Sequence, residues 1–153
     1  FYTVNTAKLS ENVWKEAEKM LEQIQKYPQK EEYQKLVEAD RINLYEREAE
    51  KGDDRKFLEE TDRVFKENLR GDPAWKLYER KLVYLESKQP DISGEFERFL
   101  KKYPKVMDAY VEYSIYLCRN NKMTQAQRVY REGRKQTGMT SKRAEELRRK
   151  LGL

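Results

Sequence analysis

Residues 110–133 read YVEYSIYLCRNNKMTQAQRVYREG, and this stretch decides the fold. It contains two segments rich in residues that favour helix, separated by the turn-forming pair Asn120-Asn121. Two helices joined by a tight turn form a hairpin that buries apolar side chains between its arms. The stretch therefore predicts a helical hairpin.

The rest of the chain has the same character. Its 153 residues include only 8 Val, 4 Ile and 6 Thr, whereas Glu, Lys, Leu, Arg, Gln and Ala fill the segments between turn-forming residues. The sequence predicts an all-α fold in which Asp91 caps one helix and Thr124 with Gln127 forms a capping box for another. We expect eight helices, at roughly 10 to 27, 30 to 50, 54 to 70, 73 to 88, 91 to 103, 105 to 120, 123 to 137 and 141 to 151.

A sequence pattern repeats along these helices. The aromatic pair Trp75 and Tyr78 recurs as Tyr110 and Tyr113, 35 residues later. A single hairpin cannot cover its own apolar face, so stacked neighbours bury it for one another. The repeat predicts an α-α superhelix, or solenoid, of about three helix pairs with flanking helices. We expect one helical-repeat domain over 1–153, with its clearest repeats at 73–103 and 105–137, a weaker unit at 30–70 and a basic C-terminal helix at 141–151.

The pattern resembles the half-a-tetratricopeptide (HAT) repeat. The resemblance rests on the aromatic-x-x-Tyr opening and on the second helix, which reads AQRVYREG at 126–133. Phe96 and Tyr103 depart from it, because they stand where small residues are expected. The ordinary tetratricopeptide (TPR) repeat, whose period and small positions overlap, is the alternative family. The resemblance implies that the repeats pack through Trp75, Tyr78, Tyr110, Tyr113, Ala126, Val129, Tyr130 and Gly133.

Proteins with HAT repeats are scaffolds in RNA-processing complexes. The resemblance therefore implies a non-catalytic protein-interaction scaffold in an RNA-processing or ribonucleoprotein assembly, with other protein subunits as partners and homodimerisation left open. It favours a nuclear location within the cell, and an organellar location stays open. The alternative function is a TPR-like adaptor or accessory subunit of a multiprotein complex that does not involve RNA.

The residues that the chain lacks argue against catalysis. It has no histidine and one cysteine, Cys118, which we expect to be a small buried residue. Ser-His-Asp and Cys-His sites and His/Cys zinc sites are therefore excluded, and we expect no catalytic, cofactor or metal site. The lack of paired cysteines favours an intracellular compartment. No apolar run of 18 residues is present, so we expect no membrane insertion.

Positive charge is concentrated at the C-terminal end. Residues 119–153 contain 11 basic and 3 acidic residues. Basic side chains can contact phosphates or an acidic protein partner, although the same side chains also suit a solvated helix face. Most tyrosines have the spacing of buried residues, and Tyr84 and Tyr116 are the better candidates for stacking on bases. The candidate contacts for RNA or an acidic partner are Arg134, Lys135, Lys142, Arg143, Arg148, Arg149 and Lys150.

Overall fold

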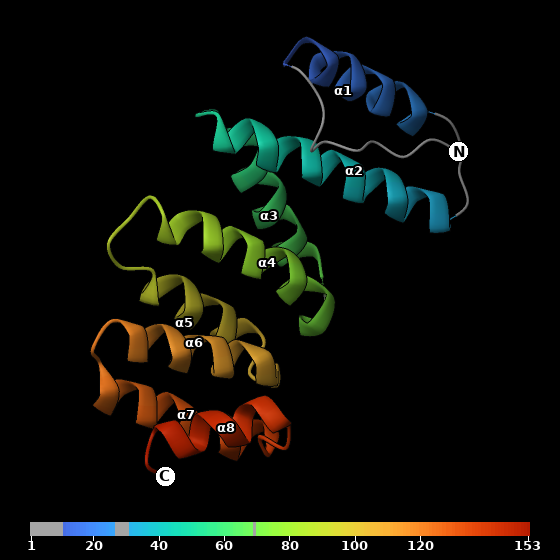
Figure 1. Cartoon of the computed structure of the whole chain (residues 1–153). Helices are drawn as coiled ribbons and strands as arrows, with labels where there is room; N and C mark the ends of the chain where they lie inside the picture. The colour runs from blue at the N-terminus through green and yellow to red at the C-terminus, as the bar shows by residue number, and fades with distance from the viewer. Residues whose placement is uncertain (1–10, 27–30, 69) are drawn as a thin grey trace. The chain divides into compact units, whose positions relative to one another are not determined.

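The computed structural model describes residues 11–26, 31–68 and 70–153, and α-helix is the only regular secondary structure within these ranges (Figure 1). The prediction of an all-α fold is therefore confirmed for the described part of the chain, where the helix ends differ from the expected ones by at most three residues. The helices are α1 (Glu11–Gln25), α2 (Glu31–Glu50), α3 (Arg55–Glu67), α4 (Gly71–Glu86), α5 (Ser93–Lys102), α6 (Met107–Arg119), α7 (Met123–Thr137) and α8 (Lys142–Lys150).

The chain divides into two compact units. The first ends at Arg63 and the second begins at Val64, so that the boundary lies within α3. That residues 1–153 form one domain stays a prediction.

In the first unit, ion pairs connect α3 to the two helices before it. The Lys56 ammonium contacts the Glu18 carboxylate on α1. Nη2 of Arg63 lies 2.7 Å from Oε1 of Glu38 on α2. These charged contacts supplement a small apolar cluster between α1 and α2, which consists of Ala17, Leu21, Val37 and Leu44.

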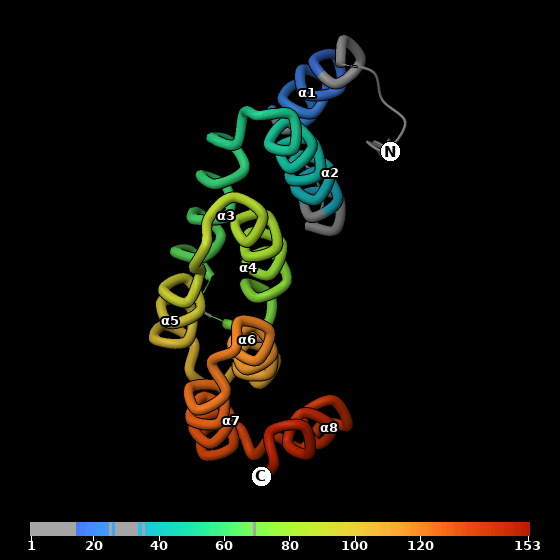
Figure 2. The backbone as a smooth tube through the Cα atoms, turned by 60° about the vertical axis from the view of Figure 1, so that its left-hand side comes forward, coloured from blue at the N-terminus to red at the C-terminus, as the bar shows by residue number. Residues whose placement is uncertain are grey.

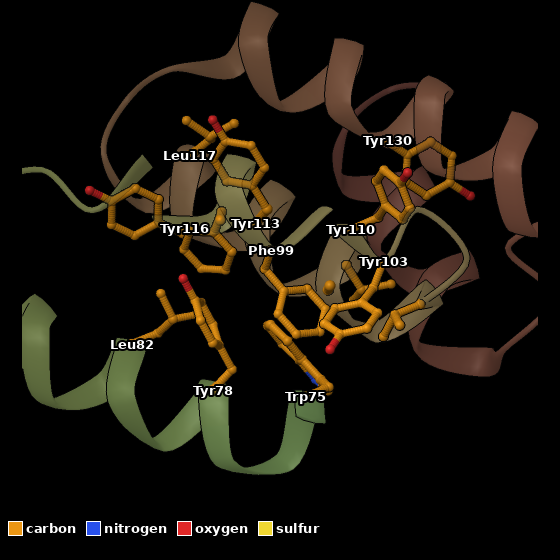
Figure 3. Close-up of a cluster of buried hydrophobic side chains, with 14 of the residues drawn as sticks. Trp75, Tyr78, Leu82, Phe99, Tyr103, Tyr110, Tyr113, Tyr116, Leu117 and Tyr130 are labelled. Carbon is orange, nitrogen blue, oxygen red and sulfur yellow. The ribbon is translucent and has the colours of Figure 1, made fainter. Parts of the chain in front are cut away.

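In the second unit, α5 packs against both α4 and α6. The ring centroid of Phe99 on α5 lies 4.9 Å from that of Trp75 on α4. Phe96 stacks on Tyr113 of α6, with 4.8 Å between centroids and 8° between planes. Figure 3 shows Trp75, Tyr78 and Phe99 meeting in one aromatic cluster. Full burial of one such side chain contributes about 1.5–3 kcal/mol, so aromatic contacts dominate the packing of this unit.

The same contacts also show how the helices of this unit are arranged. Trp75 lies near the start of α4 and touches Phe99 near the end of α5, so these two helices run antiparallel. Figure 2 shows α4 and α6 along one side of the unit and α5 and α7 along the other. Each helix from α4 to α7 therefore packs on the next one in the chain, as in consecutive hairpins.

Gly133 marks a close approach between α6 and α7. A Cβ atom at this position would lie 2.6 Å from Cβ of Tyr110 and would also overlap Cε of Met139. Ala126 and Tyr130 are buried on the same face of α7, whereas Val129 is only partly buried. The two helices approach closely because residue 133 has no side chain.

Both expected helix caps differ from the structure. Oδ1 of Asp91 accepts a hydrogen bond from the Ser93 N–H at 2.9 Å, but Asp91 lies one residue before the N-cap of α5, which is Ile92 and has no side-chain cap. No side chain caps the start of α7, so the capping box of Thr124 with Gln127 is not formed. The Gln127 amide instead donates to the carbonyl of Leu151 at 2.8 Å, which connects α7 to the residues that end α8.

Candidate nucleic-acid interface

All seven predicted contact residues lie on α7 and α8, and both helices present one apolar face to the core. On α8, Ala144 and Leu147 are buried. Its start is fixed by Ser141, whose Oγ accepts a hydrogen bond from the Ala144 N–H at 3.1 Å. Because the apolar residues of each helix point inwards, the basic residues are left on the outside.

Three of the predicted contact residues on α8 are already in ion pairs. The Arg143 guanidinium contacts the Glu112 carboxylate on α6. Arg148 lies 2.7 Å from Glu145, and its hydrogen bonds hold the pKa of that carboxyl below its usual value. Arg149 lies 3.8 Å from the same carboxylate. These three arginines therefore contribute less free positive charge than the sequence suggests.

The outer face of α7 carries a second set of cations. Arg128, Arg131 and Lys135 are exposed and lie on the side of the helix opposite Ala126 and Tyr130. A spacing of three and four residues places them in one line along the helix. None of the three forms an ion pair with a residue in the described ranges. We call these three residues the α7 stripe.

The remaining predicted cations lie beside the stripe or beyond it. Arg134, Lys142 and Lys150 are exposed. Arg134 lies on the flank of α7 that faces α8, where its charge acts on Glu145. The structure thus separates the seven predicted residues into three that are paired, Lys135 in the stripe, and three exposed cations outside it.

Arg128 and Arg131 belong to the eleven basic residues of 119–153 but are not among the seven candidate contacts that we predict from the sequence. The sequence contains a signal for them, because a 100° turn per residue places both on the side of the helix away from the buried positions Ala126 and Tyr130. A helix that buries one face exposes the side chains on the opposite face. The total charge of a segment, by contrast, does not show which of its cations are in ion pairs.

The tyrosines do not form a platform for bases in this region. Tyr116, a predicted stacking candidate, is 3% exposed, and its hydroxyl accepts from the Ile92 N–H at 3.1 Å. The prediction for Tyr116 is therefore wrong, because its ring fills the core beside Phe96. Tyr84 is half-buried on α4. Within residues 107–153 every aromatic side chain is buried.

A buried polar cluster joins α4 to α5. Oε2 of Glu95 accepts hydrogen bonds from the Tyr78 hydroxyl at 2.6 Å and from the Lys81 ammonium at 2.9 Å. Burial by itself raises the pKa of a carboxyl, but these two hydrogen bonds and the charges of Lys81 and Arg98 together outweigh it, so the pKa of Glu95 is lowered. The Lys81 side chain is only 8% exposed, so this cluster is part of the packing between helices.

A shallow cavity of about 330 Å³ lies at the start of α4, beside the turn between α5 and α6. Arg70, Lys102 and Lys105 are among its lining residues. Both lysines already have partners, because Lys102 donates to the Lys66 carbonyl at 3.0 Å and Lys105 to the Gln136 carbonyl at 3.2 Å. They satisfy carbonyls at the ends of α3 and α7, where a positive charge is favourable.

The described part of the chain contains neither a metal-binding cluster nor a helix that could span a membrane. There, no three Asp, Glu or Cys side chains come together in a way that could hold a metal ion. Among the described helices, none combines the length and the apolar character needed to cross a bilayer. No protein-family model, curated protein sequence or solved structure matches the chain.

Proposed function

We propose that the chain is a non-catalytic protein-interaction scaffold of HAT-repeat type, built as a solenoid of helix pairs, within an RNA-processing or ribonucleoprotein assembly. The observation that carries the proposal is the contact between Gly133 and Tyr110, two of the positions through which the resembled repeat packs. Consecutive pairing of α4 to α7 through aromatic rings supports the same architecture. Stacked helix pairs present long surfaces to other subunits, which is how such arrays bind their partners.

The chemistry of the buried groups supports a scaffold rather than an enzyme. The Lys81 ammonium is held by Glu95, so it is not a free base or nucleophile. Cys118 is partly rather than fully buried, and this burial raises the pKa of its thiol, which stays protonated and weakly nucleophilic. The tyrosine hydroxyls of Tyr78 and Tyr113 donate to carboxylates, and their pKa values are raised by burial. These groups stabilise the packing of helices.

The proposal is tested by recovering the full chain with an affinity tag from cells that express it, before and after treatment with ribonuclease. A scaffold is expected to retain a defined set of protein subunits after the RNA is removed. Gly133→Ala, which disturbs the contact between α6 and α7, is expected to lose part of that set, whereas Gly94→Ala, a substitution in open space, keeps it. Recovery of the chain alone, as a monomer or a homodimer, under both conditions would contradict the proposal.

A further inference from the structure

The α7 stripe forms a short linear array of positive charge. Arg128 and Lys135 are seven residues apart, which corresponds to about 10 Å along a helix that rises 1.5 Å per residue. Arg131 lies between them on the same side. The three residues of the stripe lie on the side of α7 opposite the buried residues Ala126, Tyr130 and Gly133. Two further apolar residues of the helix are not fully buried: Val129 is partly buried, and Met123, at the start of the helix, is 46% exposed.

This composition favours a nucleic acid over a protein as the partner of the stripe. Protein interfaces obtain most of their affinity from buried aromatic or aliphatic anchors, with charges at the rim. The α7 stripe offers no such anchor. A phosphate backbone needs none, because each neutralised phosphate releases counterions and contributes affinity through charge alone.

The same surface lacks the means to read bases. Recognition of unpaired bases uses exposed aromatic rings on which they stack. The tyrosines nearest in sequence, Tyr116 and Tyr130, are both buried. Phosphate contacts position a protein on a nucleic acid without carrying sequence information.

From the charge and spacing of the α7 stripe and the lack of exposed aromatic residues within 107–153, we propose that the stripe binds the phosphate backbone of single-stranded RNA without reading its sequence. The choice of RNA rests on the function proposed above. The ion-paired arginines of α8, Arg143, Arg148 and Arg149, are not the main contacts, because Glu112 and Glu145 already occupy them.

The test is fluorescence anisotropy of the full chain with a labelled single-stranded RNA of mixed sequence, titrated over a range of salt concentrations. Three phosphate contacts on a single strand predict that log K falls against log salt with a slope of about −2, so that affinity drops roughly 20-fold when salt rises fourfold. An RNA with the same bases in shuffled order is expected to bind equally well.

Three charge-matched variants locate the contact. Arg128→Gln/Arg131→Gln/Lys135→Gln is expected to weaken binding at low salt by at least about tenfold and to flatten the salt slope. Two control variants each remove the same number of charges: Arg143→Gln/Arg148→Gln/Arg149→Gln on α8 and Lys76→Gln/Lys88→Gln/Lys101→Gln on α4, on α5 and in the turn between them. The RNA affinity of both is expected to stay within a few-fold of that of the unaltered chain. The third variant changes exposed lysines away from α7, so it provides the control if the α8 variant does not fold.

Unaltered affinity and salt slope in the α7 variant would overturn the inference. So would binding to polyglutamate of equal charge as tight as binding to RNA, which would assign the stripe to an acidic protein. If the purified chain binds no RNA at low salt, the inference fails, but protein subunits that are retained after ribonuclease treatment would still support the scaffold.

Discussion

Replacing Gly133 by alanine is expected to destabilise the protein, although alanine is the better helix former. In an unobstructed helix this replacement stabilises by about 0.5–1 kcal/mol, because glycine loses more backbone entropy on folding. At position 133 the new Cβ would stand 2.6 Å from Cβ of Tyr110. Carbon atoms in contact prefer roughly 3.5–4.0 Å, so the helices must separate by about 1 Å.

That separation sets the size of the effect. Overpacking of a core costs typically about 1–3 kcal/mol, and Cβ of Tyr110 cannot move without its helix. When the gain in helix propensity is subtracted from this cost, Gly133→Ala is expected to lower the free energy of unfolding by up to about 2.5 kcal/mol. Gly94→Ala is the matched control, since no atom lies within 4 Å of the added Cβ. It is expected to raise the free energy of unfolding by up to about 1 kcal/mol.

Urea denaturation followed by circular dichroism measures both values, with the two substitutions compared in the same buffer. The two variants are expected to change stability in opposite directions. If Gly133→Ala stabilises the protein as much as Gly94→Ala does, then α6 and α7 do not approach closely at this position and the account of their packing is refuted.

Three further predictions concern the buried polar groups. Lys81→Met removes the cation that is hydrogen-bonded to the Glu95 carboxylate, with only the more distant charge of Arg98 remaining, and is expected to cost about 2 kcal/mol in urea denaturation. Arg119→Met, which breaks an exposed pair, is expected to cost less than about 1 kcal/mol, and equal costs would contradict the burial of the Lys81–Glu95 pair. The pKa of Glu95 is lower in the folded protein, so its contribution to stability is complete above the ordinary value of 4.5 and is lost as pH falls through the folded value. Glu95→Gln should therefore flatten the acid limb of a plot of urea midpoint against pH. An unchanged acid limb would contradict the lowered pKa of Glu95. Burial and the Glu97 carboxylate raise the pKa of Tyr113 to about 12, so its contribution is complete below pH 10 and is lost as pH rises towards 12. Tyr113→Phe should therefore reduce the alkaline loss of stability, and a titration of tyrosine absorbance in which this substitution removes an ordinary ionisation near pH 10 would contradict the burial of Tyr113.

Local sequence signals predict the helices of this protein well. Few β-branched residues and regular breaks give the helix ends to within three residues over the described ranges. Asp91 accepts a backbone N–H from Ser93, as a carboxylate just before a helix can, although the N-cap of α5 is the next residue, Ile92. These features depend on a few neighbouring residues, which is why sequence alone is enough.

Partners that are distant in the sequence are not predictable in the same way. Gln127 bonds to Leu151 instead of to its own helix end, and Arg143 pairs with Glu112 on another helix. The Lys81–Glu95 pair joins residues 14 positions apart. Each of these choices depends on which helix lies opposite, and the residue types alone do not specify it. For that reason the sequence predicts the basic C-terminal end but does not predict which of its cations form ion pairs.

The scaffold proposal rests on the claim that the helix pairs bury one another's aromatic faces. The most direct measurement is thermal unfolding, by circular dichroism, of a chain shortened to end at Lys105. The account predicts that the cooperative transition is lost or that the protein aggregates, because Phe96 loses its stacking partner Tyr113 and the aromatic face of α5 is exposed. An undiminished cooperative transition would show that the remaining helices do not need their neighbours, and would contradict the account.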